Sequence, residues 1–383
     1  MKVLIALTYF EPYKSGLSVY ALRLAKGLTE LGHEVVVISS QYRLDLALDD
    51  TLDGIKLVRV PVWFRLSKGV VMPSLSSRAR EWVEWADIVN LHLPQFESSV
   101  YARLANRFGK KLLVTYHCNL NMTGGWLNRL AGKVTTHIGR QVLRQAHLIV
   151  QNSLDYAENS PSLKPFLNKV KAVPTPVELI RVPEGRVNAF KLKYGIQSEE
   201  KILGLAGRVA SEKGYEYLVE ALPLVRRAYP SVRVLHAGMW KGVMGEEAYQ
   251  ARVEALVKPL GDHWKSLGFL SDEDFRAFFG ACDLLVFSSL NSTESFGIVQ
   301  IEAMLQGTPV VASDLPGVRQ PVLQTGFGRV VPIRDSQALA QAIISVLDEG
   351  KKDRSLPAAY LETFSQENVA QQYDMLMKAL VQP

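Results

Sequence analysis

The sequence predicts an α/β protein built from two doubly wound parallel sheets, one in each half of the chain. Short apolar runs alternate with amphipathic helical patterns along the whole length, which is typical of βαβ units. A length of 383 residues is sufficient for two domains with substantial cores. The block Ala172 to Val177 carries two prolines in three residues and interrupts both periods, which predicts a stiff connector. We therefore expect two Rossmann-like domains, over residues 1–175 and 178–360, that face a central cleft.

The first half contains six predicted strands and two helices with clear ends. An amphipathic helix over Leu17–Leu31 ends before Gly32, because glycine is favoured just past a helix. A second helix, over Phe96–Phe108, ends before Gly109 in the same way. The strands are expected at Val3–Leu7, Glu34–Ser39, Ile55–Val60, Ile88–His92, Lys111–Tyr116 and His147–Gln151.

The second half repeats the alternation with six more strands. They are expected at Ile202–Ala206, Arg233–Ala237, Trp264–Phe269, Leu284–Ser288, Pro309–Ala312 and Gly328–Val331. The helices between and after them are expected at Tyr215–Tyr229, Glu246–Leu260, Asp272–Gly280, Phe296–Gln306 and Ser336–Leu347. A last helix near Gln366–Leu380 has spare apolar residues, so it should cover another element.

Composition and cysteine use indicate a cytoplasmic globular enzyme. A hydrophobic fraction of 48% with 21% charged residues is typical of such proteins. The two cysteines, Cys118 and Cys282, are far apart and suggest no disulfide framework, which fits a reducing compartment. The apolar start Met1–Leu7 is too short for the core of a signal peptide, and no run approaches the length of a membrane span.

Positive charge is concentrated in the first half. The first 177 residues carry 22 Lys and Arg against 13 Asp and Glu. Within them Ser98 to Leu154 holds eight basic residues and no acid, and it includes an amphipathic helix expected over Trp126–Gln145. This stretch suits the inner face of an anionic membrane or an acidic acceptor, although solvated helix faces that cover the sheet would look the same. No nucleic-acid-binding motif accompanies the charge, so no nucleic acid partner is expected.

Two glutamates eight residues apart, Glu294 and Glu302, mark the most informative segment. Ser-Phe-Gly follows the first, and Ala-Met-Leu-Gln-Gly-Thr-Pro follows the second. Along a helix this step spans roughly 12 Å, so the carboxylates suit two parts of one extended polar ligand. Gly297 leaves bare backbone N–H groups at a helix start, where a phosphate is favoured. The pattern indicates a nucleotide sugar, whereas a solvated helix face is the alternative for an arbitrary pair at this spacing.

This segment resembles the E-x7-E signature of the retaining GT-B glycosyltransferases of the GT4 type. The resemblance implies that the first domain lies on the acceptor side, with a C-terminal helix at about residues 365–383 packed back on it. The second domain would bind the nucleotide sugar: Glu302 would accept hydrogen bonds from the ribose hydroxyls, and Glu294 from the transferred sugar. The rest of this donor-binding segment would be Ser295, Phe296, Gly297 and Ile298.

The loop after the strand Ile202–Ala206 suits a diphosphate. Gly207 is followed by two cations five residues apart, Arg208 and Lys213. Arg208 can make planar bidentate contacts and Lys213 acts as a point charge, although Glu212 could instead pair with a surface cation. The loop resembles the family's G-R-x4-K-G element. That resemblance implies neutralisation of the leaving diphosphate without a metal ion or another cofactor.

The resemblance assigns two further donor-binding residues by position. Leu270, after the strand Trp264–Phe269, corresponds to the contact with the base, although a plain strand end explains it equally well. Gly16, in the loop after the first strand, would let the backbone approach the donor phosphate. The chain departs from the family here, with Ser15-Gly16 in place of two glycines. It departs again at His236-Ala-Gly238, where Gly-Asp-Gly is usual.

His117 is the catalytic candidate of the first half. It ends the strand Lys111–Tyr116, so its ring can bond a substrate hydroxyl or stabilise developing charge. The family often has a histidine here near the reacting centre, which implies a catalytic set of Glu294, His117, Arg208 and Lys213. A structural histidine with satisfied hydrogen bonds is the alternative. His92, His117 and Cys118 lack zinc-type spacing, so no metal site is predicted.

The resemblance implies transfer of a hexose-type sugar from a nucleoside diphosphate, UDP favoured over GDP, to a hydroxyl acceptor with retention. The acceptor could be lipid-linked or a polysaccharide precursor. A nucleotide-sugar epimerase on the same fold would instead need acid and base groups against the sugar ring. An NAD-dependent oxidoreductase would need G-x-G-x-x-G after Val3–Leu7 or Ile202–Ala206, and neither strand has it. Arg208, Lys213 and both glutamates argue against a non-catalytic binding module.

Overall fold

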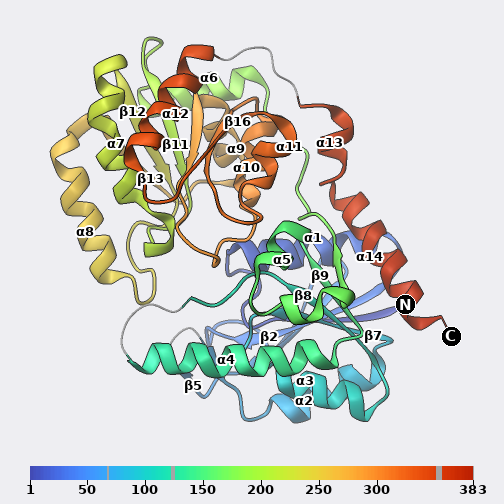
Figure 1. The fold of residues 1–383 in the computed structure, drawn as a ribbon. Helices are drawn as coiled ribbons and strands as arrows, with labels where there is room; N and C mark the ends of the chain where they lie inside the picture. Colours follow the sequence, from blue (N-terminus) through green and yellow to red (C-terminus); the bar gives the residue numbers. More distant parts are fainter. Residues whose placement is uncertain (67–68, 122–125, 351–355, 383) are drawn as a thin grey trace. The chain divides into compact units, whose positions relative to one another are not determined.

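The computed structural model describes residues 1–66, 69–121, 126–350 and 356–382, which form two compact units (Figure 1). Unit 1 consists of Met1–Val177 and Thr363–Pro383, and unit 2 of Glu178–Glu362. Each unit is a Rossmann-like α/β structure around a largely or wholly parallel sheet. The predicted fold class is confirmed.

Unit 1 is built on an eight-stranded sheet with the order β10-β9-β8-β7-β1-β2-β4-β3. All neighbours are parallel except β3 and β4, and the order reverses at β1, which lies between β2 and β7. The strands are β1 Lys2–Ala6, β2 Glu34–Gln41, β3 Asp49–Leu52, β4 Ile55–Pro61, β7 Ile88–Leu93, β8 Lys111–Tyr116, β9 Leu148–Gln151 and β10 Val170–Ala172. A separate hairpin pairs β5 Phe64–Leu66 with β6 Gly69–Val71.

Both faces of this sheet are buried. Leu4 and Ala6 of β1 enter one core, and Val3 and Ile5 enter the other, as the two-residue period of a strand requires. The first core is covered by α2 Leu75–Trp85, α3 Ser98–Arg107, α4 Trp126–Gln145 and α5 Leu154–Asn159. The second is covered by α1 Gly16–Glu30 and α14 Gln366–Val381. A 3-10 turn, Lys164–Lys169, precedes β10.

The C-terminal helix α14 packs against α1, as Figure 1 shows. The two helices approach closely because Gly27 has no side chain: a Cβ there would lie 2.7 Å from Cβ of Ala370. The Tyr20 and Tyr373 hydroxyls share a hydrogen bond of 2.9 Å. The chain enters α14 through a bridge between Val177 and Ser365. The helix is therefore an integral part of the unit 1 core.

Unit 2 has a six-stranded parallel sheet with the order β13-β12-β11-β14-β15-β16, which reverses between β11 and β14. Its strands are β11 Lys201–Ala206, β12 Val232–Ala237, β13 Trp264–Gly268, β14 Leu284–Phe287, β15 Val310–Ser313 and β16 Gly328–Val331. The helices are α6 Glu184–Tyr194, α7 Tyr215–Ala228, α8 Glu247–Val257, α9 Asp272–Ala281, α10 Ile298–Leu305, α11 Gln320–Thr325, α12 Ser336–Glu349 and α13 Ala358–Glu362. Two 3-10 turns occupy Ser211–Lys213 and Lys258–His263.

Several elements were not predicted from hydrophobic periodicity. Strand β3 has a polar sequence with mostly exposed side chains, and it forms because its backbone pairs with the sheet edge at β4. Helix α6 buries only Phe190, so it has almost no apolar stripe to recognise. Among the described helices, none is long and apolar enough to cross a membrane.

Candidate functional site

The candidate site of unit 2 lies at the carboxyl ends of the strands, near the point where the sheet order reverses. Strands β11 and β14 are neighbours there, and ligands of open α/β sheets bind beyond such carboxyl ends. Gly207, the first residue after β11, has φ of 135°. Gly238, after β12, lies so close that a Cβ on it would be 2.1 Å from the Gly207 oxygen. Only glycine fits at Gly238, and the two turns are held together.

Lys213 and Glu294 meet at these strand ends. The Lys213 Nζ atom lies 2.5 Å from Oε2 of Glu294, and their side chains are 16% and 20% exposed. The same ammonium lies 5.0 Å from the centre of the Phe287 ring. The Ser288 hydroxyl donates a hydrogen bond of 2.9 Å to the Lys213 carbonyl. The structure thus joins a predicted phosphate-binding cation to a predicted sugar-binding acid.

Arg208 pairs with Glu212 rather than with Glu294. Its Nη2 atom donates a hydrogen bond of 2.8 Å to Oε1 of Glu212, whose side chain is nearly buried. The Arg208 side chain is 41% exposed, so the five-donor guanidinium is also accessible to a ligand. Glu212, which the sequence offered as a partner for a surface cation, therefore holds the Arg208 guanidinium from one side.

The N-terminus of α10 follows shortly after Glu294 in the chain. Gly297 caps the helix with φ of 81°, and a Cβ there would lie 2.5 Å from Cζ of Phe287. The side chain of Gln300 donates to the Phe296 carbonyl at 2.6 Å, which fixes the turn before the helix. The first backbone N–H groups of α10 supply the partial positive charge of a helix start.

The other predicted residues of this segment divide between the loop and α10. Ser295 and Phe296 are buried before the helix, whereas Ile298 begins it and lies one turn from Glu302, on the same helix face. Glu294 precedes the helix by four residues. The expected 12 Å step along a helix is therefore wrong for the Glu294–Glu302 pair, because only the part from Ile298 is helical.

Two polar residues that were not predicted as part of the site support these loops. His236 is fully buried, with Nε2 2.7 Å from the Gly207 carbonyl and Nδ1 3.1 Å from the Ser266 hydroxyl. Burial lowers the pKa of His236 to about 4, so the ring is neutral at pH 7. The buried Glu246 accepts a hydrogen bond of 2.9 Å from the Ser211 backbone. The departure from Gly-Asp-Gly at His236 was the available signal.

Leu270 lies at a different strand end. It follows β13, which is separated from β11 by β12, and its side chain is partly buried beside the exposed Phe269. Gly268 contributes through its backbone, since its carbonyl accepts a hydrogen bond of 2.8 Å from Gly238 N–H. The Gly207, Gly238 and Gly268 turns therefore form one continuous edge.

His117 and Gly16 lie in unit 1. His117 follows β8, with Nε2 2.9 Å from Nδ1 of His92 and its ring edge-on to Tyr20. Burial lowers the pKa of His117 to about 3. Gly16 begins α1, and a Cβ there would meet nothing within 4 Å, so space alone does not demand glycine. Among the described residues, no group of His, Cys, Asp or Glu side chains is arranged to hold a metal ion.

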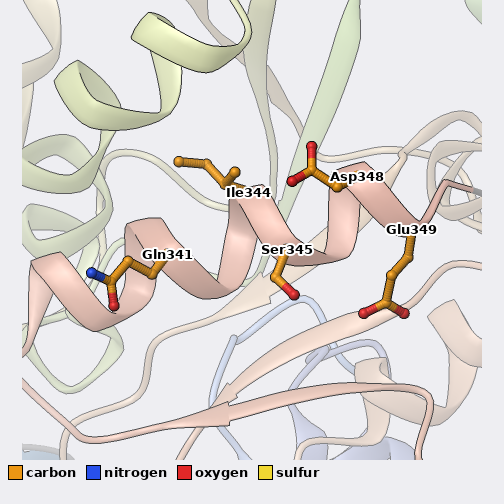
Figure 2. A pocket seen from close by; sticks show the side chains of 5 residues that line it. All are labelled: Gln341, Ile344, Ser345, Asp348 and Glu349. Atoms are coloured by element: carbon orange, nitrogen blue, oxygen red, sulfur yellow. The ribbon is translucent and has the colours of Figure 1, made fainter.

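A surface hollow lies elsewhere in unit 2. Figure 2 shows its lining on one face of α12, a volume of about 600 Å³ bounded by Gln341, Ile344, Ser345, Asp348 and Glu349. Asp348 accepts a hydrogen bond from Tyr229, and Glu349 pairs with Arg329. Among the described residues, its lining includes two carboxylates and no cation, and it includes none of the strand-end residues. It does not suit a diphosphate.

Comparison with known proteins identifies the class of both units. Residues 15–176 match the family model of the glycosyl transferase 4-like domain, and residues 187–359 match that of glycosyl transferases group 1. The phosphatidyl-myo-inositol mannosyltransferase of Mycolicibacterium smegmatis is 25% identical over 370 residues, which cover 96% of this chain and 89% of the relative.

Solved structures show the same fold. The structure of Anabaena HepE in complex with UDP-glucose matches with a TM-score of 0.77 and 20% identity, over 99% of this chain and 100% of the other. The catalytic domain of starch synthase IV from Arabidopsis thaliana, bound to ADP and acarbose, matches with a TM-score of 0.68 and 14% identity, over 99% of both chains. At these identities the likeness shows the fold alone.

Proposed function

Because this chain belongs to the GT4-type glycosyltransferases with the GT-B fold, we propose that it transfers a hexosyl group from a nucleoside diphosphate sugar to a hydroxyl acceptor, with retention of configuration. The observation that carries the proposal is the Lys213–Glu294 pair at 2.5 Å. It brings a cation for the diphosphate and an acceptor for sugar hydroxyls to adjacent strand ends.

Positive charge in unit 2 is available for the leaving diphosphate. Lys213 supplies a point charge, Arg208 supplies a partly exposed planar donor set, and the start of α10 supplies oriented backbone N–H groups. In the transition state negative charge grows on the departing phosphate oxygen, and fixed donors stabilise that charge most effectively. We assign Glu302, one turn into α10, to the ribose hydroxyls.

Retention is proposed to proceed on one face of the sugar. The bond between the anomeric carbon and the donor phosphate oxygen breaks, and the acceptor oxygen bonds to that carbon from the same face. The acceptor proton passes to the leaving phosphate oxygen. This route needs no protein nucleophile, and the role of the protein is to position the two substrates and exclude water.

We propose that the nucleotide of the donor is UDP. A ligand-binding experiment tests the donor site. The choice of UDP is supported by the fold neighbour whose structure contains UDP-glucose. Thermal unfolding of the chain is followed with UDP, GDP, ADP and NAD in turn, without added metal. We expect UDP at about 100 times its dissociation constant to raise Tm by about 5 °C or more, and NAD to have no effect.

Matched variants locate the binding site in this experiment. Glu302→Gln should reduce the shift with UDP, because an amide presents only one carbonyl oxygen to a vicinal diol. Glu184→Gln changes an exposed glutamate at the start of α6 and should leave the shift unchanged. The proposed donor site would be overturned if Tm rose with NAD alone, or if none of the nucleoside diphosphates raised Tm.

A lipid-borne acceptor is proposed on the basis of α4. Arg129 and Lys133 are exposed there beside Leu130 and Val134, whose side chains are 51% and 41% exposed. Cations beside exposed aliphatic groups favour an anionic lipid surface. The mannosyltransferase relative, named for a phosphatidyl-myo-inositol substrate, supports the same acceptor class.

Sedimentation with vesicles tests this contact. The chain should pellet at low salt with vesicles of phosphatidylcholine and phosphatidylserine, but not with phosphatidylcholine alone, and high salt should release it. Arg129→Glu combined with Lys133→Glu should reduce binding. The same charge change in unit 2, Arg227→Glu with Lys258→Glu, is the control. Failure to pellet with the anionic vesicles would rule out the membrane contact.

A further inference from the structure

A chain of buried side chains links α14 to His117 inside unit 1. In order, its members are Tyr20, Tyr373, Thr115, Asn90, His92 and His117, of which only His117 exceeds 1% exposure. The Tyr20–Tyr373 and Tyr373–Thr115 distances are both 2.9 Å, and Thr115 to Oδ1 of Asn90 is 3.0 Å. Asn90 Nδ2 to His92 Nε2 is 3.4 Å, and His92 Nδ1 to His117 Nε2 is 2.9 Å.

The amide of Asn90 sets the direction of the chain. Its oxygen can only accept, and it receives the proton of the Thr115 hydroxyl. Its nitrogen can only donate, so Nε2 of His92 must be the acceptor and carries no proton. A neutral His92 then has its proton on Nδ1, from which it donates to Nε2 of His117.

Both rings are neutral in this arrangement. Two imidazoles whose nitrogens lie 2.9 Å apart in the interior cannot both be protonated without strong repulsion. Burial lowers the pKa of both histidines, with no acidic side chain acting on either. Since His117 accepts at Nε2, its single proton is on Nδ1. Among the described residues, Nε2 is its only ring nitrogen with a hydrogen-bond partner.

We propose that Asn90 and His92 are positioning residues that hold His117 in the tautomer with its proton on Nδ1, and that this N–H donates to a substrate oxygen. His117 then acts as a fixed neutral donor and not as a general acid or base. Tyr373 ties the same hydrogen-bond chain to the C-terminal helix, and Tyr20 ends the chain on α1. Only the identity of the substrate oxygen rests on the proposed function.

Nitrogen NMR of the full-length protein tests the tautomer directly. The seven histidines are labelled with ¹⁵N, and long-range ¹H–¹⁵N correlations are recorded at pH 7 without substrate. The His117 signals are assigned by their loss in His117→Gln. We expect the pattern of a neutral ring protonated at Nδ1. The opposite orientation of the Asn90 amide would put the proton on Nε2, and that pattern, or an imidazolium, would overturn the proposal.

Two ring variants test the positioning role. His92→Phe keeps a planar ring and removes the donor, so His117 should lose its Nδ1–H pattern and kcat/KM should fall about tenfold, the value of one neutral hydrogen bond. Tyr20→Phe is the control, because Tyr373 can still donate to Thr115. An unchanged His117 pattern in His92→Phe would contradict the proposal.

The NMR measurement separates this inference from the proposed function. The wild-type spectrum decides the tautomer even if His92→Phe fails to fold, and it requires no turnover. If the protein shows the Nδ1–H pattern but transfers no sugar, the proposed function is wrong and the tautomer of His117 is still established.

Discussion

Lys213 and Glu294 are 81 residues apart in the chain, and their side chains meet at 2.5 Å. Each is mostly shielded from water, so loss of one partner leaves a poorly solvated charge. The Lys213 ammonium is further held over the Phe287 ring. A ligand phosphate would therefore meet a cation whose position is already fixed, which lowers the reorganisation needed for catalysis.

Replacement of this cation should reduce turnover strongly. Lys213→Met keeps much of the aliphatic stem and removes the charge, so we expect kcat/KM for the donor sugar to fall about 100-fold or more. Steady-state kinetics measures the effect. Lys241→Met is the control, because that side chain is 72% exposed and pairs with Glu254. A change of less than about threefold in Lys213→Met would be inconsistent with a diphosphate contact.

Helix α10 is the element that organises the donor side of unit 2. Its cap, Gly297, combines a left-handed backbone with contact against the Phe287 ring. Gly307, just past the other end of the helix, has nearly the same φ, 79°, but a Cβ there would meet nothing within 4 Å. A side chain at Gly307 would meet backbone strain alone, whereas one at Gly297 would meet backbone strain and a clash with Phe287.

Alanine at these two positions should have unequal effects on the unfolding of unit 2. Both variants pay about 1–2 kcal/mol for the left-handed backbone. Gly297→Ala adds about 1–3 kcal/mol, because the ring of Phe287 must move. Urea denaturation measures the difference in free energy of unfolding. Equal losses in the two variants would show that Phe287 does not constrain the cap.

Buried neutral histidines connect the stability of the whole molecule to pH. His92 and His117 lie in unit 1 and His236 in unit 2, and burial lowers all three pKa values from the ordinary 6.5. The folded chain therefore binds fewer protons than the unfolded chain below pH 6.5. Stability present above that pH is lost as the pH falls.

Tm should fall steadily between pH 6.5 and 4.5, with each histidine contributing up to about 1.4 kcal/mol per pH unit. For His236 the loss continues until its folded pKa of about 4. Differential scanning calorimetry across this range measures the slope. His236→Gln should flatten the slope of unit 2, whereas His137→Gln, at an exposed position of α4, should not. Identical slopes in both variants would contradict the assignment.

The sequence alone determined the fold class and most of the strands. Periodicity, glycines after helices and the proline-rich connector are local signals, because each follows from backbone sterics or from which side chains share a face. The family was also readable from contiguous motifs, those around Glu294 and Glu302 and after Gly207. The roles predicted for these residues and for His117 remain predictions.

Only the tertiary structure decided which side chains meet. The pairing of Lys213 with Glu294 depends on β11 lying beside β14, and the polar chain to His117 depends on α14 packing over β8. Strand order and helix docking are set by long-range packing of the cores, which no local pattern encodes. For the same reason the sequence did not show that His236 supports the Gly207 turn.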